Sequence, residues 1–213
     1  GFRSQPLLLF GVVAYLSRTR DVTLERIVYG AYEVGEDGPD GVRKASVFDL
    51  TVLADLLEWV HAVDTFIMRG DARRLADLLI DAHNRQWVMR GSERENLPMK
   101  LKVMGKTLRD FSDSVRLLRP FDALEAAAKI AQGSREAEEE SARWAKPFAQ
   151  ILRRVADEME TLAMDRPSEP SYESLERQLE LIKHYVDKDL VVQAILLGGE
   201  WVVSWLALCS GQT

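Results

Sequence analysis

Four residues of types that bind anions immediately precede a predicted helix: Gly1, Phe2, Arg3 and Ser4. Ser4 can cap that helix, which the apolar pattern predicts over residues 6–18. Unpaired N–H groups and the helix dipole favour an anion at such an end, and the Arg3 guanidinium adds a positive charge. The segment therefore predicts a binding site for a phosphate or a nucleotide. The alternative is an ordinary helix cap beside an ordinary surface charge.

A row of basic residues is a second candidate site. Segment 99–119 holds six basic and two acidic residues. Four of the basic residues lie on one face of a predicted helix, opposite its apolar arc: Lys102, Lys106, Arg109 and Arg116. Such a row could contact RNA. Asp113 interrupts it and no aromatic residue is interleaved for base stacking, so we favour a solvated helix face.

The composition argues against metal chemistry. The 213 residues include one cysteine, Cys209, and three histidines, His61, His83 and His184. These are too few for a multi-ligand zinc site, and a single thiol excludes an intrachain disulfide. We expect no metal, no resident cofactor and a cytoplasmic location. The net charge of −6 means that any contact with nucleic acid must be local.

Two apolar segments invite comparison with membrane segments, and we expect neither to enter a membrane. Residues 6–16 are too few to span a bilayer and lack a basic leader and a small-residue cleavage signal. Residues 190–209 are nearly long enough, but they include Glu200 and the adjacent Gly198 and Gly199. We predict that this second segment is a buried helix.

Residues 1–50 combine helix and strand signals. After the helix, residues 25–33 are rich in Ile, Val and Tyr and predict a strand, which the turn-rich segment 35–41 ends. Residues 44–49 predict a second short strand. A helix that leads into a strand is half of an α/β unit, and a strand before Gly1 would complete it. Since the chain starts without Met and within what reads as a motif, we expect it to be a fragment or a processed product.

From residue 51 onward, the apolar spacing predicts helices alone. The clearest stripe comprises Trp144, Phe148, Ile151, Val155, Met159 and Leu162, and Pro147 should kink or restart its helix. In the helix predicted over 171–189 the stripe comprises Leu175, Leu179, Ile182 and Val186. The fold class is therefore mainly α, with a bundle of about six or seven helices in residues 51–213.

Several segments of the chain resemble the CRISPR-associated DxTHG family. The likeness is strongest in residues 1–10 (GFRSQPLLLF), 27–33 (IVYGAYE) and 47–71, and residues 172–206 resemble that family's late helical segment. In the family, an Asp-x-Thr-His-Gly-Phe-Arg motif closes a strand of a Rossmann-like CARF domain, and a helical HEPN domain follows. The chain departs from this pattern because the Asp-x-Thr-His half of the motif and the first strand and loop of the CARF domain would lie before Gly1.

The resemblance implies a sensor and effector of type III CRISPR immunity. Residues 1–50 would be the C-terminal remnant of the CARF domain, and 51–213 a HEPN-type domain. The CARF part would bind cyclic oligoadenylate, an activating ligand, across a homodimer, with Gly1 to Ser4 at the ligand. The HEPN part would cleave single-stranded RNA without a metal ion, because the ribose 2′-OH attacks the adjacent phosphate while His and Arg handle protons and charge.

The catalytic motif implied by the resemblance is Arg-x(4–6)-His, and Arg177 with His184 is the pair that fits it formally. Residues seven apart share a helix face, and we predict that this face is solvated and lies opposite the apolar stripe. In relatives the motif generally lies near the C-terminus, so the catalytic residues are expected beyond Thr213 or are absent. Two alternatives stay open: a CARF–helical sensor without nuclease activity, and a helical scaffold.

Overall fold

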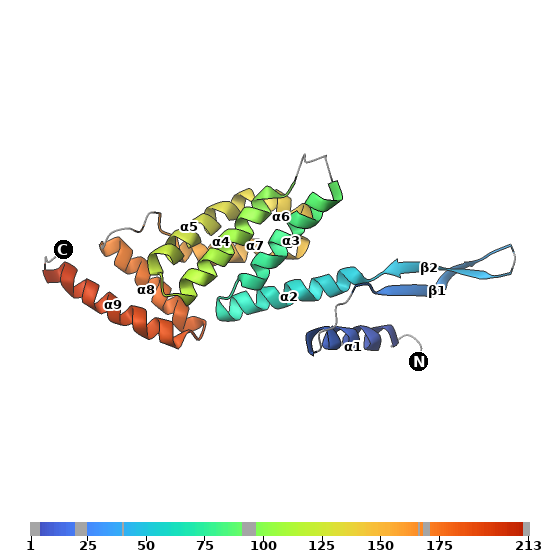
Figure 1. The fold of residues 1–213 in the computed structure, drawn as a ribbon, viewed down its shortest axis with the longest axis horizontal. Helices are drawn as coiled ribbons and strands as arrows, with labels where there is room; N and C mark the ends of the chain where they lie inside the picture. Colours follow the sequence, from blue (N-terminus) through green and yellow to red (C-terminus); the bar gives the residue numbers. More distant parts are fainter. Residues whose placement is uncertain are drawn as a thin grey trace. The chain divides into compact units, whose positions relative to one another are not determined.

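The computed structural model describes residues 5–19, 25–39, 41–90, 97–165, 167 and 171–210. These residues are mainly helical and include one pair of strands (Figure 1). The chain divides into two compact units, residues 1–58 and 59–213. Helix α2, Thr51–Arg69, begins in the first unit and ends in the second.

The first unit contains a helix and a β-hairpin. Helix α1 is Gln5–Thr19, strand β1 is Val28–Asp37 and strand β2 is Arg43–Asp49. The strands pair antiparallel, with Val28 opposite Asp49 and Asp37 opposite Arg43. The predicted helix and both predicted strands are confirmed. The sheet in the described residues is a hairpin, so the Rossmann-like assignment of this region stays a prediction.

Asp49 fixes the short connection between β2 and α2. One of its carboxylate oxygens accepts a hydrogen bond from the Thr51 N–H at 3.0 Å, and the other pairs with the Arg26 Nε at 3.0 Å. The Thr51 hydroxyl also accepts from the Ile27 N–H at 3.0 Å. Hydrogen bonds from Thr51, and then Arg26, lower the pKa of Asp49 to about 2. Strand β2 therefore leads into α2 through a tied junction rather than a loose linker.

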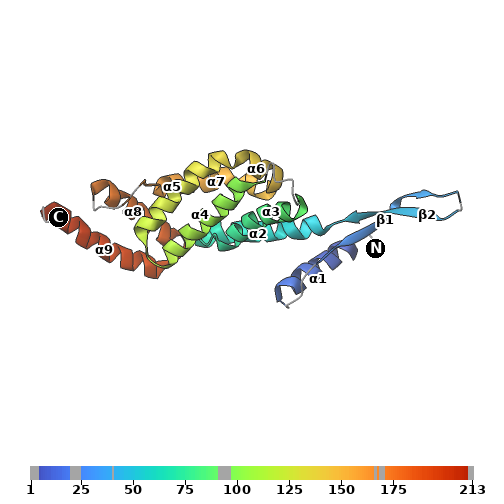
Figure 2. The same ribbon diagram turned by 45° about the horizontal axis from the view of Figure 1, so that its top comes forward.

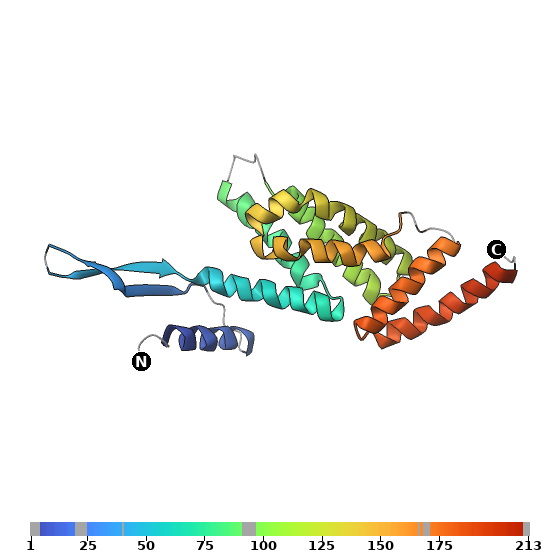
Figure 3. The same ribbon diagram turned by 180° about the vertical axis from the view of Figure 1, so that it is seen from behind.

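The second unit is a helical bundle that contains the end of α2 and, in the described residues, seven further helices (Figures 2 and 3). These are α3 Arg73–Arg90, α4 Met99–Arg116, α5 Pro120–Glu136, α6 Glu138–Trp144, α7 Lys146–Leu162, α8 Tyr172–Asp187 and α9 Val191–Ser210. The core lies where α3 packs on α4, α4 on α5 and α5 on α7. The largest fully buried side chains there include Phe66, Phe111, Phe148, Leu108, Ile130 and Met159.

Local signals set the ends of several helices. Gly70 ends α2 with a φ of +68°, a left-handed conformation that glycine adopts without strain, and its N–H donates to the Phe66 carbonyl. Pro147 lies in the first turn of α7, one turn after α6 ends at Trp144. The predicted restart at Pro147 is therefore confirmed.

The predicted apolar stripe of α8 is wrong in part. Leu175 is buried and Ile182 packs against the core, but Leu179 and Val186 are 37% and 61% exposed. The buried face instead comprises Ser174, Leu175, Gln178, Leu181, His184 and Tyr185. Polar residues can occupy this face because they are satisfied locally: the Gln178 amide donates to the Ser174 hydroxyl at 3.0 Å.

The prediction of a buried helix over residues 190–209 is also wrong. Helix α9 packs mainly against α8, and among its described residues only Ala194 and Leu197 are buried (Figure 3). An apolar composition does not bury a helix that contacts the bundle through one face. Of the helices in the described ranges, α9 alone is long and apolar enough to cross a membrane by length and composition.

Candidate functional site

The predicted anion-binding residues lie outside the described part of the chain. Gly1, Phe2, Arg3 and Ser4 precede Gln5, where α1 begins. The helix that should present its N-terminus to the anion is thus present. The role of these four residues stays a prediction.

The basic row on α4 faces carboxylates of α3 at two of its four positions. The Arg109 guanidinium forms an ion pair with Asp77, and Arg116 contributes to lowering the pKa of Asp71, after the hydrogen bond from Arg73. Such pairing reduces the positive potential that would attract RNA phosphates. The arrangement favours the alternative stated above, a solvated helix face.

Arg177 and His184 are not brought together as an exposed pair, and the predicted solvation of His184 is wrong. His184 is 7% exposed, whereas the Arg177 side chain lies at the surface, where its Nη1 donates to the Thr161 carbonyl at 2.9 Å. Helix α8 turns Leu181 and Tyr185 into the core, and His184 lies between them on the same face. The two side chains therefore point to different environments.

His184 lies among helices α4, α7 and α8, next to the turn that ends α2. Its Nδ1 is 3.5 Å from Oε1 of Glu158, and its ring meets the Phe111 ring edge-on at 5.9 Å between centroids. No described residue forms a hydrogen bond with its Nε2, which faces Gly70. Burial lowers the pKa of His184 to about 4, although the Glu158 carboxylate opposes this shift. The imidazole is therefore neutral at neutral pH.

Lys188 completes what we call the His184 cluster: His184, Glu158 and Lys188. The Lys188 Nζ is 2.5 Å from Oε1 of Glu158 and donates to the carbonyl of Ile67, in the last turn of α2, at 2.7 Å. A cation is favoured there because the last carbonyls of a helix have no partner within the helix. The cluster has acid–base side chains, but its imidazole is shielded from solvent, so its evident role is to join α2, α7 and α8.

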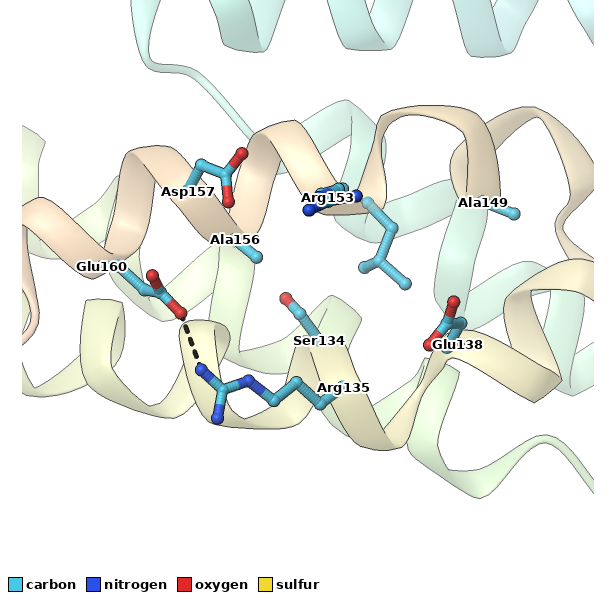
Figure 4. Close-up of a pocket in the computed structure, with 9 residues that line it drawn as sticks. Ser134, Arg135, Glu138, Ala149, Arg153, Ala156, Asp157 and Glu160 are labelled. Carbon is cyan, nitrogen blue, oxygen red and sulfur yellow. Dashed lines mark hydrogen bonds and ion pairs between the residues drawn. The ribbon is translucent and has the colours of Figure 1, made fainter.

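A separate open groove of about 450 Å³ lies between α5 and α7 (Figure 4). Arg135 of α5 reaches across it to Glu160 of α7, with 2.9 Å between Nη2 and Oε1. Arg153, Asp157 and Glu138 also line the groove. Two guanidinium groups and three carboxylates suit a small ligand that carries both signs of charge, whereas the excess of carboxylates disfavours a polyanion.

The sequence analysis missed this groove. Its arginines and carboxylates come from separate helices, and only packing of α5 on α7 brings them together. The available signal was the polar face of α7, where Arg153, Asp157 and Glu160 recur at spacings of four and three. That spacing identifies a solvated face and does not indicate which helix lies opposite.

Metal binding finds no support in the geometry. Within the described ranges, no three His, Cys, Asp or Glu side chains form a group that could hold a metal ion. The acid–base groups that the structure does assemble are the closed His184 cluster and the open groove between α5 and α7.

Comparison with known proteins identifies the family of the helical region. A family model described as the second domain of the CRISPR-associated protein MJ1674 matches residues 55–167. This range is more than half of the chain and includes α3 to α7, the groove and Glu158, but not α8 or α9. No curated protein matches the chain. The predicted association with CRISPR is therefore supported, and the chain belongs to the family defined by the second domain of the CRISPR-associated protein MJ1674.

Proposed function

We propose that the chain is part of a CRISPR-associated effector that senses cyclic oligoadenylate and whose helical domain cleaves single-stranded RNA without a metal ion. The observation that carries this proposal is the family match over residues 55–167. The resemblance of residues 1–10 and 27–33 to the DxTHG family adds the messenger and the nuclease activity to that match. The mainly helical second unit is compatible with a HEPN-type domain.

The proposed messenger site is the N-terminal end of α1. A cyclic oligoadenylate carries one negative charge per phosphate, and Arg3 with the free N–H groups of the helix end would bind such a phosphate. Loss of one charge-assisted contact should weaken binding about ten- to hundredfold. Titration calorimetry of the full-length protein with cyclic tetra- and hexa-adenylate would measure this for Arg3→Ala. Lys44→Ala, which removes a basic side chain of the hairpin, is the control and should bind like the unaltered protein.

A specific observation supports a second candidate, a sensor without nuclease activity. His184, the histidine with an arginine at the required spacing, is buried and does not form an exposed pair with Arg177. In this second candidate, messenger binding would change contacts with partner proteins and would not start RNA cleavage.

One experiment separates the two candidates. Full-length protein is incubated with a short fluorescent single-stranded RNA in EDTA, with and without each cyclic oligoadenylate. The nuclease proposal predicts an increase in cleavage of about tenfold or more with one messenger. Messenger binding without cleavage would favour the sensor. Absence of binding to either ring size would contradict both candidates.

A further inference from the structure

Helix α9 presents a broad apolar surface on the side away from α8 (Figure 3). Seven of its large apolar side chains are half or more exposed: Val191, Val192, Ile195, Leu196, Val202, Val203 and Leu206. Monomeric soluble proteins rarely expose continuous apolar patches larger than a few hundred Å². This surface therefore points to a partner.

The exposed residues follow the repeat of a helix–helix contact. Five positions recur at spacings of three and four along one face: Val192, Ile195, Gly199, Val202 and Leu206. We call these five positions the outer seam. Spacings of three and four in alternation are those of a coiled-coil contact line. The opposite face of α9 is already used, because Ala194 and Leu197 are buried and the Trp201 indole donates to the Leu175 carbonyl of α8 at 2.8 Å.

The α9 surface is complementary to itself about Gly199. Val192 and Leu206 lie seven residues to either side of this glycine, and Ile195 and Val203 lie four residues to either side. If two antiparallel copies of α9 crossed at Gly199, Ile195 would face Val203 of the second copy at both ends. Such reciprocal contacts are the property of a two-fold interface. No atom of the described residues lies within 4 Å of a Cβ placed on Gly199, so the two backbones can approach closely there.

The charges around α9 disfavour the other classes of partner. The helix has no basic residue, which disfavours RNA. Glu200 lies at its middle, where a bilayer would be least polar, and the neighbouring α8 carries the charged residues Glu173, Glu176, Glu180 and Lys183. An apolar protein surface is the remaining class, and the symmetry about Gly199 selects a second copy of this chain.

The exposed area indicates a modest affinity. Transfer energies of about 1.5–3 kcal/mol correspond to roughly 60–120 Å² per aliphatic side chain, so seven that are half to two-thirds exposed supply roughly 300–500 Å². A standard interface buries about 800 Å² per partner, and polar residues at the rim add to the apolar part. A contact at the lower end of this size range suits a reversible dimer.

We propose that two copies of the chain associate through the outer seams of α9, antiparallel and crossing at Gly199, with a dissociation constant on the order of micromolar. This inference specifies the homodimer that the family resemblance implies. It rests on the α9 surface, which lies outside the matched residues 55–167, and not on messenger or RNA binding.

Sedimentation velocity between about 1 and 100 µM tests the dimer without messenger or RNA. The double variant Ile195→Glu, Val203→Glu places like charges opposite each other at both ends, and it should raise the dissociation constant about hundredfold or more. The variant Ile195→Lys, Val203→Glu places opposite charges there and should remain dimeric, with an affinity that falls as salt rises. Val103→Glu, at an exposed apolar site of α4, is the matched control and should dimerise normally.

Three results would overturn the inference. They are a monomer at the highest concentration, a dimer that tolerates the two glutamates, and equal disruption by both charged double variants, which would exclude the antiparallel contact. A monomer that pellets with phosphatidylcholine vesicles would assign the seam to a membrane and would also overturn it. Because both altered side chains are exposed, the variants should melt like the unaltered chain, and melting curves show whether folding has failed. Messenger-binding assays are separate, so failure of one proposal leaves the other intact.

Discussion

The Nζ of Lys188 lies 2.5 Å from Oε1 of Glu158, and the two side chains are only 10% and 21% exposed. The same ammonium group donates to the Ile67 carbonyl at 2.7 Å. One cation thus connects α8 with α7 and with the end of α2. Neither charge can be removed alone without leaving the other poorly solvated.

Lys188→Met should lower the free energy of unfolding by about 3 kcal/mol, because Glu158 would remain largely buried without its counter-ion. Urea unfolding followed by circular dichroism measures the change. Lys183→Met is the control in the same helix: Lys183 pairs with Glu180 at the surface, and its loss should cost about 0.5 kcal/mol or less. Equal losses for the two variants would contradict a buried role for Lys188.

His184 should make the fold less stable in mild acid. Burial holds its pKa at about 4, below its usual value of 6.5, so the unfolded chain takes up the proton at a higher pH than the folded chain. The stabilising contribution is therefore complete above pH 6.5 and is lost as the pH falls towards 4. The shift corresponds to at most about 3 kcal/mol.

The pH effect can be assigned to His184 by substitution. His184→Gln removes the titrating group, so the difference in unfolding free energy between about pH 7 and pH 4.5 should become smaller than in the unaltered chain. His61→Gln changes an exposed histidine and should leave that difference unchanged. An unchanged pH dependence in His184→Gln would show that other groups cause it.

In α7, the critical core residue is Leu152 and not Ile151. Leu152 is 5% exposed, whereas Ile151 is only partly buried, which corrects the stripe expected from the sequence. Leu152→Ala should cost about 2–5 kcal/mol through lost burial and a cavity, and Ile151→Ala should cost clearly less. Urea midpoints of the two variants give the comparison, and a larger loss at Ile151 would place the wrong face of α7 in the core.

Gly105 permits the close packing of α3 on α4. A Cβ at this position would lie 2.9 Å from the Ala76 carbonyl oxygen and from Cγ1 of Ile80. Gly105→Ala should therefore destabilise the chain by about 1–3 kcal/mol, although alanine favours helix by about 1 kcal/mol over glycine. Gly198→Ala meets no described atom within 4 Å and should be neutral or stabilising. Thermal melting of both variants provides the measurement, and stabilisation of both would refute the steric role.

Local signals predicted the elements well, because they depend on nearby residues. The buried arc of α4, the end of α2 at Gly70 and the restart of helix at Pro147 all follow from spacing, glycine and proline. The same reasoning failed for α8 and α9. Burial of His184 and exposure of Leu179 depend on which helices lie beside α8, and a periodic pattern does not contain that information.

The candidate sites show the same limit. The pair Arg135 and Glu160 crosses from α5 to α7, and Lys188 reaches the end of α2 from a distant part of the sequence. A search for Arg-x(4–6)-His considers one helix at a time, so it selected two side chains that the fold separates into surface and interior. Packing, rather than spacing, decides which titratable groups meet.

His184→Gln in the full-length protein should leave most messenger-stimulated RNA cleavage intact, because the imidazole is shielded from solvent and RNA cannot reach it. Arg177→Ala should behave alike, since that side chain lies apart at the surface, bonded to the Thr161 carbonyl. Initial cleavage rates should be measured at a temperature where circular dichroism shows both variants folded. A positioned acid or base contributes about 10²–10⁴-fold to the rate. A loss of that size in either folded variant would mean that the helix opens on activation and that Arg177 and His184 form the active site after all.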